Sequence, residues 1–239
     1  MSGHSKWSKV KHQKATTDVV KSFAFTKASR AITVAVREGG GVTDPASNFH
    51  LRLAIEKAHE VNMPKENIRR AILKASGAGA LSIEQIMYEG YGPGGIALLI
   101  ETHTDNRQRT VSGVKNALER FGGTLASPGA VGFQFRRRGI ITVPRAGIDY
   151  DKILAAALDA GAEDVVATTD LYEVYTNDPD LPRVKKSLET GNIPIETTAR
   201  IMHPTSPMDA QESVRTKIDE LIAALEELDD VQSVFTNLT

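Results

Sequence analysis

The spacing of apolar residues changes near residue 76 of this chain of 239 residues, and the change restricts the folds that it can adopt. Before that point apolar side chains recur every three or four positions, as they do in amphipathic helices. After Gly77 and Gly79, short apolar runs and alternating patterns appear between the helical ones, which is typical of strands. The sequence therefore predicts a helical segment followed by α+β structure.

Three helices are predicted in the first segment. The first covers residues 18–37, with Asp18 as its N-cap. Asp44 is expected to cap the second helix, with Pro45 at its first position. Pro64 separates the second helix from the third, because a proline disfavours the helical conformation in the residue before it. The third helix ends near Ser76.

The segment 136–204 is predicted to form a ferredoxin-like domain, because its elements follow the order β-α-β-β-α-β. We expect strands at residues 139–143, 163–167, 171–176 and 193–202, and helices at residues 153–160 and 178–191.

The stretches on either side of this segment are predicted to complete one another. Residues 80–135 supply β-α-β, with a strand at 96–100 after the turn-rich stretch 88–95, a helix at 106–121 and strand spacing at 131–135. Residues 205–239 supply α-β and so nearly complete a second ferredoxin-like unit.

The predicted fold class is therefore α+β, with a three-helix domain and two ferredoxin-like domains, one inserted into the other. The predicted domains are 1–79, 80–135 with 205–239, and the insertion 136–204. Two ordinary sequential α/β domains are the alternative.

Charge is distributed unevenly along the chain. Residues 1–76 hold 14 lysines and arginines against 6 acidic residues, a net charge of +8, whereas residues 77–239 carry −9. Such segregation favours a basic module for polyanions attached to an acidic remainder, although a chance cluster of solvated lysines is the plainer alternative.

The densest basic cluster surrounds the single tryptophan, Trp7. Lysine side chains neutralise phosphates, and a tryptophan can stack on an unpaired base or instead anchor the arm on the helices. Arg70 is among the arginines that extend the basic surface if their helix faces align, and the triplet Arg136–Arg138 fits a phosphate contact as well as a solvated hinge. The predicted nucleic-acid-binding residues are Lys6, Trp7, Lys9, Lys11, His12, Lys14, Lys21, Lys27 and Arg30.

The sequence offers no catalytic constellation. It lacks cysteine, its six histidines lack metal-ligand spacing, and it contains no Gly-x-Ser-x-Gly elbow. No apolar run approaches the roughly 18 residues that span a bilayer, and the N-terminal residues lack the apolar region of a secretory signal. We therefore expect no enzyme activity, cofactor, metal or membrane partner, and a cytoplasmic location.

Several ordered motifs resemble the YebC-type family. They are Gly3-His4-Ser5-Lys6-Trp7, Asn62-Met63-Pro64-Lys65, Tyr88-Glu89-Gly90-Tyr91-Gly92-Pro93-Gly94-Gly95 and Thr104-Asp105-Asn106-Arg107, and the likeness covers essentially the whole chain. The resemblance implies one helical and two ferredoxin-like domains, the third inserted into the second, and no enzymatic activity. Family members are described as DNA-binding regulators and as ribosome-associated factors that help translation of difficult stretches, and a mitochondrial relative activates translation of cytochrome oxidase.

The chain departs from the family at the start of its first helix. Where relatives commonly carry Lys-Arg-Gly-Lys, this sequence reads Val20-Lys21-Ser22-Phe23, and Ala31 stands where a glutamate is usual. Two positive charges are missing there, so the start of the first helix is less basic than in relatives.

These observations lead to one main hypothesis: a non-catalytic, monomeric regulator of gene expression that binds DNA or ribosomal RNA, with the ribosome as a candidate assembly. A small-molecule sensor, with an anion held at Asp105-Asn106-Arg107, is one alternative, although a simple helix cap by Asp105 is preferred there. A protein–protein scaffold is the other.

Overall fold

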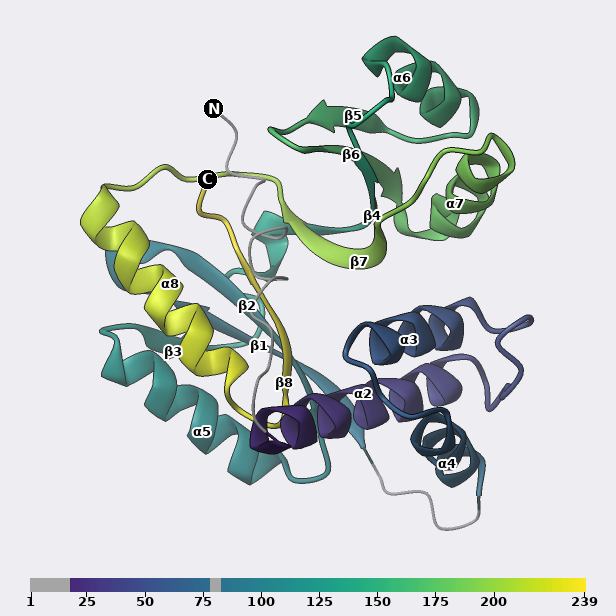
Figure 1. Cartoon of the computed structure of the whole chain (residues 1–239). Coiled ribbons are helices and arrows are strands. Elements are labelled where there is room, and N and C mark those ends of the chain that lie inside the picture. The colour runs from purple at the N-terminus through teal and green to yellow at the C-terminus, as the bar shows by residue number, and fades with distance from the viewer. Residues whose placement is uncertain (1–17, 78–82) are drawn as a thin grey trace. The chain divides into compact units, whose positions relative to one another are not determined.

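The computed structural model describes residues 18–77 and 83–239, which form two compact units (Figure 1). One unit is Phe135–Thr205, and the other contains the remaining described residues. None of the helices in this part of the chain is long and apolar enough to cross a membrane.

Three helices open the described chain, as predicted: α2 (Asp18–Glu38), α3 (Phe49–Glu60) and α4 (Lys65–Ser76). They enclose a core of small and branched side chains, among which Ile32 and Leu51 are fully buried. Many of the buried residues of this core are alanines, and such small side chains allow helix axes to approach one another.

The predicted cap of α3 by Asp44 is wrong. The helix begins four residues later, where the Asn48 side chain accepts a hydrogen bond from the Leu51 amide. Asp44 instead accepts hydrogen bonds from Ala46 N and Ser47 Oγ, so it stabilises a separate turn. Both residues satisfy the statistics of a cap, and tertiary contacts of Asn48 with two backbone carbonyls decide between them.

The first sheet belongs to the same unit as these helices. Its elements are β1 (Glu84–Tyr91), β2 (Ala97–Thr104), α5 (Arg107–Arg120), β3 (Thr124–Ala126), α8 (Glu212–Glu226) and β8 (Val231–Thr236). The strand order is β3-β1-β2-β8, with every neighbouring pair antiparallel. The helices α5 and α8 pack on the sheet, where Val114 and Leu221 join a core with Leu98 and Ile100 of β2.

Two expectations about this sheet are corrected. Residues 88–91, taken as part of a turn, are the end of β1, and the turn itself begins at Gly92. The strand expected at 131–135 is absent from the described chain, because Gly132–Gln134 form a short 3-10 helix and β4 begins only at Phe135. Val131 and Phe135 are buried whereas Phe133 is 76% exposed, so their alternating spacing does not reflect one strand face.

The inserted unit has the predicted element order. Its sheet order is β5-β6-β4-β7 and all its pairs are antiparallel, which is the ferredoxin-like arrangement. The expected α+β fold class, with helices followed by two four-stranded sheets, is thus confirmed, while the division into three domains stays a prediction. The elements are β4 (Phe135–Pro144), α6 (Tyr150–Asp159), β5 (Asp164–Ala167), β6 (Leu171–Asn177), α7 (Leu181–Thr190) and β7 (Thr197–Pro204).

Candidate nucleic-acid interface

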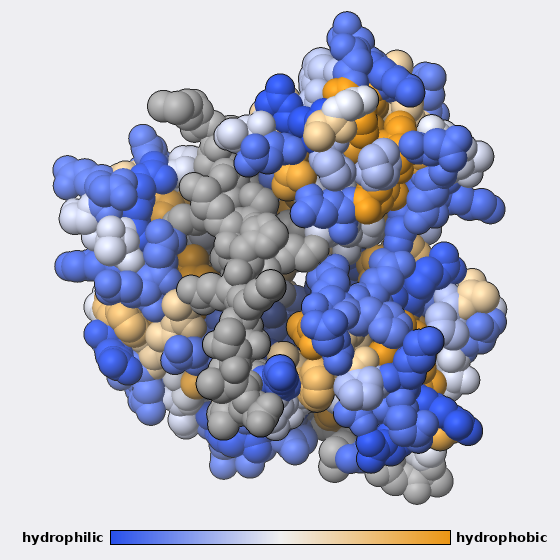
Figure 2. Space-filling view, viewed as in Figure 1, coloured by the Kyte–Doolittle hydropathy of each residue, from blue (hydrophilic) through white to orange (hydrophobic). Residues whose placement is uncertain are grey.

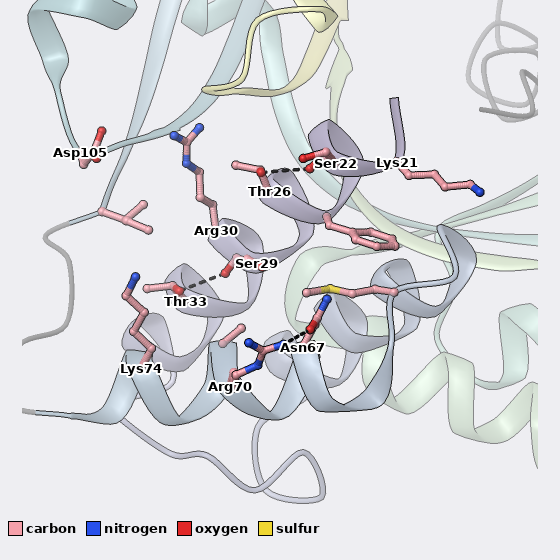
Figure 3. A pocket seen from close by; sticks show the side chains of 14 residues that line it. Lys21, Ser22, Thr26, Ser29, Arg30, Thr33, Asn67, Arg70, Lys74 and Asp105 are labelled. Atoms are coloured by element: carbon pink, nitrogen blue, oxygen red, sulfur yellow. Dashed lines mark hydrogen bonds between the residues drawn. The ribbon is translucent and has the colours of Figure 1, made fainter. Parts of the chain in front are cut away.

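A groove of about 820 Å³ lies between α2 and α4 and is bordered by Ile83 and Asp105 of the first sheet region (Figure 3). We call it the α2–α4 groove. Lys21 and Lys74 stand at opposite ends of the view, and four cations line the groove: Lys21, Arg30, Arg70 and Lys74. Figure 2 shows that hydrophilic residues also predominate over α3 and α4 on the face in view.

Helical spacing places the polar side chains of α2 in the groove. Ser22, Thr26, Ser29 and Thr33 recur at intervals of four, three and four residues, which is one helix face. The Thr26 and Thr33 hydroxyls donate to the carbonyls of Ser22 and Ser29, each at 3.0 Å. Those hydroxyl oxygens keep lone pairs that can accept a hydrogen bond from a ligand.

The α4 side of the groove follows the same rule. Asn67, Arg70 and Lys74 are three and four residues apart and line the groove together. The Arg70 guanidinium donates to Asn67 Oδ1, which orients the planar group (Figure 3). Arg70 is one of the arginines that the sequence predicts to extend the basic surface. Lys74 is not among the predicted residues, although its spacing of four from Arg70 indicates that the two share a helix face.

The groove is electropositive. Among the described residues that line it, Asp105 is the single carboxylate, and its Oδ1 lies 2.7 Å from Arg109 Nη2. The hydrogen bond from Arg109 lowers the pKa of Asp105, which therefore stays ionised and paired at neutral pH. Arg30 is balanced by Asp230, so the excess positive charge of the groove comes chiefly from Arg70 and Lys74, and it attracts anions.

Lys27 and Arg30 make a different set of contacts, which we call the α2–α8 joint. Lys27 Nζ donates to the Glu226 carbonyl at the end of α8, and burial lowers the pKa of Lys27. Arg30 Nη1 donates to the Asp229 carbonyl at 2.7 Å. Lys27 thus satisfies a carbonyl at a helix C-terminus, where the helix dipole favours positive charge, and Arg30 satisfies one in the turn that follows α8.

Asp230 is the buried centre of this joint. Its carboxylate lies 2.8 Å from Arg30 Nη1 and 2.9 Å from Arg109 Nη2, and it accepts a hydrogen bond from Thr110 Oγ1 at 2.6 Å. Burial favours a higher pKa for Asp230, but the hydrogen bonds from Arg109 and Thr110 outweigh it and lower the pKa. The ionised Asp230 therefore fixes Arg30 at the edge of the groove.

The structure separates the residues that the sequence suggested together. Lys21 and Arg30 line the groove, whereas Lys27 belongs to the joint and is not among the residues that line the groove. The other suggested residues lie outside the described part of the chain; they are Lys6, Trp7, Lys9, Lys11, His12 and Lys14.

The two remaining candidate anion sites each hold an acidic partner, which is Glu163 for Arg136 and Arg138 and Glu84 for Arg107. Arg136 and Arg138 both pair with Glu163, at 3.0 and 2.9 Å. At the start of α5, the cap is Asn106, whose Oδ1 accepts from the Arg109 amide, so the predicted cap by Asp105 is wrong. Asp105 has its own partner in Arg109, which the i, i+4 spacing on α5 brings within reach.

Comparison with known proteins gives matches along nearly the whole chain. The model of the "TACO1/YebC protein N-terminal domain" matches residues 5–78, and that of the "TACO1/YebC second and third domain" matches residues 83–238.

Relatives and one solved structure agree with these matches. A protein of a Sulfurihydrogenibium species is 43% identical over 99% of this chain and 95% of its own length, and one of Chlorobaculum tepidum is 46% identical over 100% and 95%. Both are named probable transcriptional regulatory protein. The crystal structure of the conserved hypothetical protein Aq1575 from Aquifex aeolicus is 40% identical, with a TM-score of 0.86, and the match covers 98% of this chain and 96% of that one. The chain belongs to the TACO1/YebC family.

Proposed function

We propose that this protein is a non-catalytic regulator of gene expression that binds nucleic acid through the α2–α4 groove. The observation that carries the proposal is the groove itself, in which Arg70 and Lys74 are exposed and the one carboxylate among the described lining residues, Asp105, is paired with Arg109. The names of the relatives support a role in transcription regulation. The basic residues from Lys6 to Lys14 precede α2 in the sequence and are proposed to extend the contact.

Phosphate contacts explain why this arrangement suits a polyanion. Each lysine or arginine that neutralises a phosphate releases condensed counterions, so affinity falls steeply as salt rises. Arg70, oriented by Asn67, presents a planar guanidinium that can engage a phosphate through two hydrogen bonds. Lys74 acts as a point charge. The acidic remainder of the chain disfavours binding over the rest of the surface.

A salt titration of binding tests the proposal. We expect affinity for a mixed RNA and DNA pool to fall with salt, and the pair Arg70→Ala with Lys74→Ala to weaken binding about tenfold and to reduce the salt slope by about two. The control pair, Lys115→Ala with Lys217→Ala, removes equal charge from exposed positions on α5 and α8. Equal losses in the two pairs would reject the groove as the binding site.

Two physiological targets fit this proposal, and they are DNA and ribosomal RNA. A transcription regulator acts on DNA, and a translation factor acts on ribosomal RNA. We propose a cytoplasmic monomer that acts in one of these roles without a membrane partner. Crosslinking in cells, followed by sequencing of both RNA and DNA, separates them: a footprint confined to ribosomal RNA assigns the translation role, and enriched promoter fragments assign the transcription role.

A further inference from the structure

We infer that the α2–α4 groove receives an unpaired nucleotide, with its base on an apolar wall and its phosphates on the cations. The inference rests on the proposed function and deepens it, because it specifies single-stranded or bulged nucleic acid over regular duplex. It follows from the composition of the groove, because apolar side chains line the same space as the cations.

The apolar wall consists of Phe25, Met63, Ala71 and Ile83. Met63 and Ala71 are only 4% and 7% exposed and belong to the core of the helical segment, and Phe25 packs against that core. Core packing therefore holds the wall in place without a ligand. A preformed wall lowers the entropy lost on binding, since few side chains must be ordered.

The cations stand beside this wall. Arg70 and Lys74 are exposed, and Arg30 is fixed by Asp230. The groove thus joins an apolar surface to cations within about 820 Å³, which is inside the range of roughly 300–1,000 Å³ found for small-ligand sites. The matching ligand has a flat apolar ring attached to a phosphate.

A regular duplex meets only half of this description. Its bases are stacked and paired, so its accessible surface offers phosphates to the cations and leaves the apolar wall uncovered. An unpaired nucleotide offers both a base face and phosphates, and stacking or apolar burial of one base contributes about 1–3 kcal/mol in single-strand binding proteins.

Polar groups between the wall and the cations can read the edge of such a base. Thr26 and Thr33 have committed their hydroxyl protons to carbonyls and act as acceptors. The Asn67 amide keeps its two N–H donors after Arg70 occupies its oxygen. A base carries donors and acceptors on its edge, so these groups complement it, whereas a purely aliphatic anion would leave them without partners.

Two hairpins test the inference: one carries a single bulged 2-aminopurine, and the other is identical but fully paired. At the same salt concentration we expect the bulged hairpin to bind at least about tenfold more tightly, the gain that one inserted base provides. The 2-aminopurine fluorescence should change on binding, because the base moves to a new stacking environment.

Two variants locate the base. Phe25→Leu should reduce the ratio of the affinity for the bulged hairpin to that for the paired hairpin. Because Phe25 also packs against the core, thermal melting monitors its folding. Ser29→Leu is the second variant: it fills the groove from α2 without removing a charge or a core side chain, and it should remove the preference as well.

The outcomes separate this inference from the function on which it rests. Equal, salt-dependent binding of both hairpins would leave nucleic-acid binding in place and overturn base insertion. Binding of neither hairpin would overturn both proposals. A preference for the bulge that persists in the folded Phe25→Leu and Ser29→Leu variants would place the base elsewhere and also reject the inference.

Discussion

Two basic regions of this protein differ in how much of their charge is available. The triplet Arg136–Arg138 is the denser run in the sequence, but in β4 two of its guanidinium groups share the carboxylate of Glu163. Arg70 and Lys74 are four residues apart on α4 and line a groove in which the one carboxylate among the described lining residues is already paired. Clustering in the sequence therefore does not reveal how much of the charge is paired, because the fold supplies the partners.

The same contrast exists within α2. Lys21 is exposed at the groove, whereas Lys27 is inserted against the end of α8 and donates to a backbone carbonyl. Arg30 lies in between, because it lines the groove and also contacts Asp230. Six residues along one helix are enough to change a cation from a candidate ligand contact into part of the packing.

The largest expected effect comes from the buried anchor of the groove. Asp230→Ala leaves Arg30 and Arg109 without their shared carboxylate, and we expect it to lower the free energy of unfolding by about 3 kcal/mol, as the loss of one partner of a buried ion pair does. Urea denaturation measures the change. The control is Asp229→Ala, since Asp229 contributes its backbone carbonyl to Arg30 and its side chain is exposed. Equal costs for the two variants would show that the ion pair is unimportant.

The pH dependence of unfolding gives an independent measure of the same anchor. The pKa of Asp230 is lower in the folded protein than its ordinary value of 3.8. Its contribution to stability is therefore present above that value and is lost as the pH falls through the lower, folded pKa. We expect Asp230→Asn to flatten the decrease in stability below about pH 4. If Asp230→Asn leaves the pH dependence of the free energy of unfolding unchanged below about pH 4, the pKa of Asp230 is the same in the folded and the unfolded protein.

A matched pair of double variants tests the comparison directly. Arg136→Ala with Arg138→Ala should change nucleic-acid affinity only about twofold, because the two guanidinium groups share one carboxylate, Glu163, and present less positive charge than two cations without a shared carboxylate. The loss should be about tenfold, or 1.4 kcal/mol, for Arg70→Ala with Lys74→Ala. Fluorescence anisotropy at one salt concentration measures both. A greater loss of affinity in the Arg136→Ala, Arg138→Ala variant would mean that β4 contributes more to nucleic-acid binding than the α2–α4 groove does.

The sequence predicted the elements well where hydrophobic periodicity was long. The helices α2 and α4 and the β-α-β-β-α-β order of the insertion follow from spacing alone, because each apolar stripe had one compatible period. The predictions failed over short stretches. Residues 131–135 alternate like a strand, but a 3-10 turn at Gly132–Gln134 separates the buried Val131 from the buried Phe135 and leaves Phe133 exposed.

The groove was harder to predict than the fold, because it depends on partners distant in the sequence. The environment of Lys27 is set by Glu226, 199 residues away, and no local pattern signals that contact. The basic character of residues 1–76 was readable, as was the helix spacing that groups Arg70 with Lys74. The apolar wall was not, since Ala71 belongs to a stripe that indicates only a helix core, and Met63 lies at the proline break, where no periodicity indicates burial.

The smallest expected effect comes from freeing the second basic region. Glu163→Gln keeps the size of the side chain but removes the charge that Arg136 and Arg138 share. These are partly exposed ion pairs, so the free energy of unfolding should fall by no more than about 1 kcal/mol. The two released cations should raise affinity for nucleic acid at low salt about twofold to threefold, and the gain should disappear at high salt, where exposed charges are screened.

Glu189→Gln, an exposed change on α7 without an ion pair among the described contacts, controls for net charge. An equal gain in that control would mean that affinity follows net charge alone, and that the pairing of arginines with Glu163 does not distinguish β4 from the α2–α4 groove.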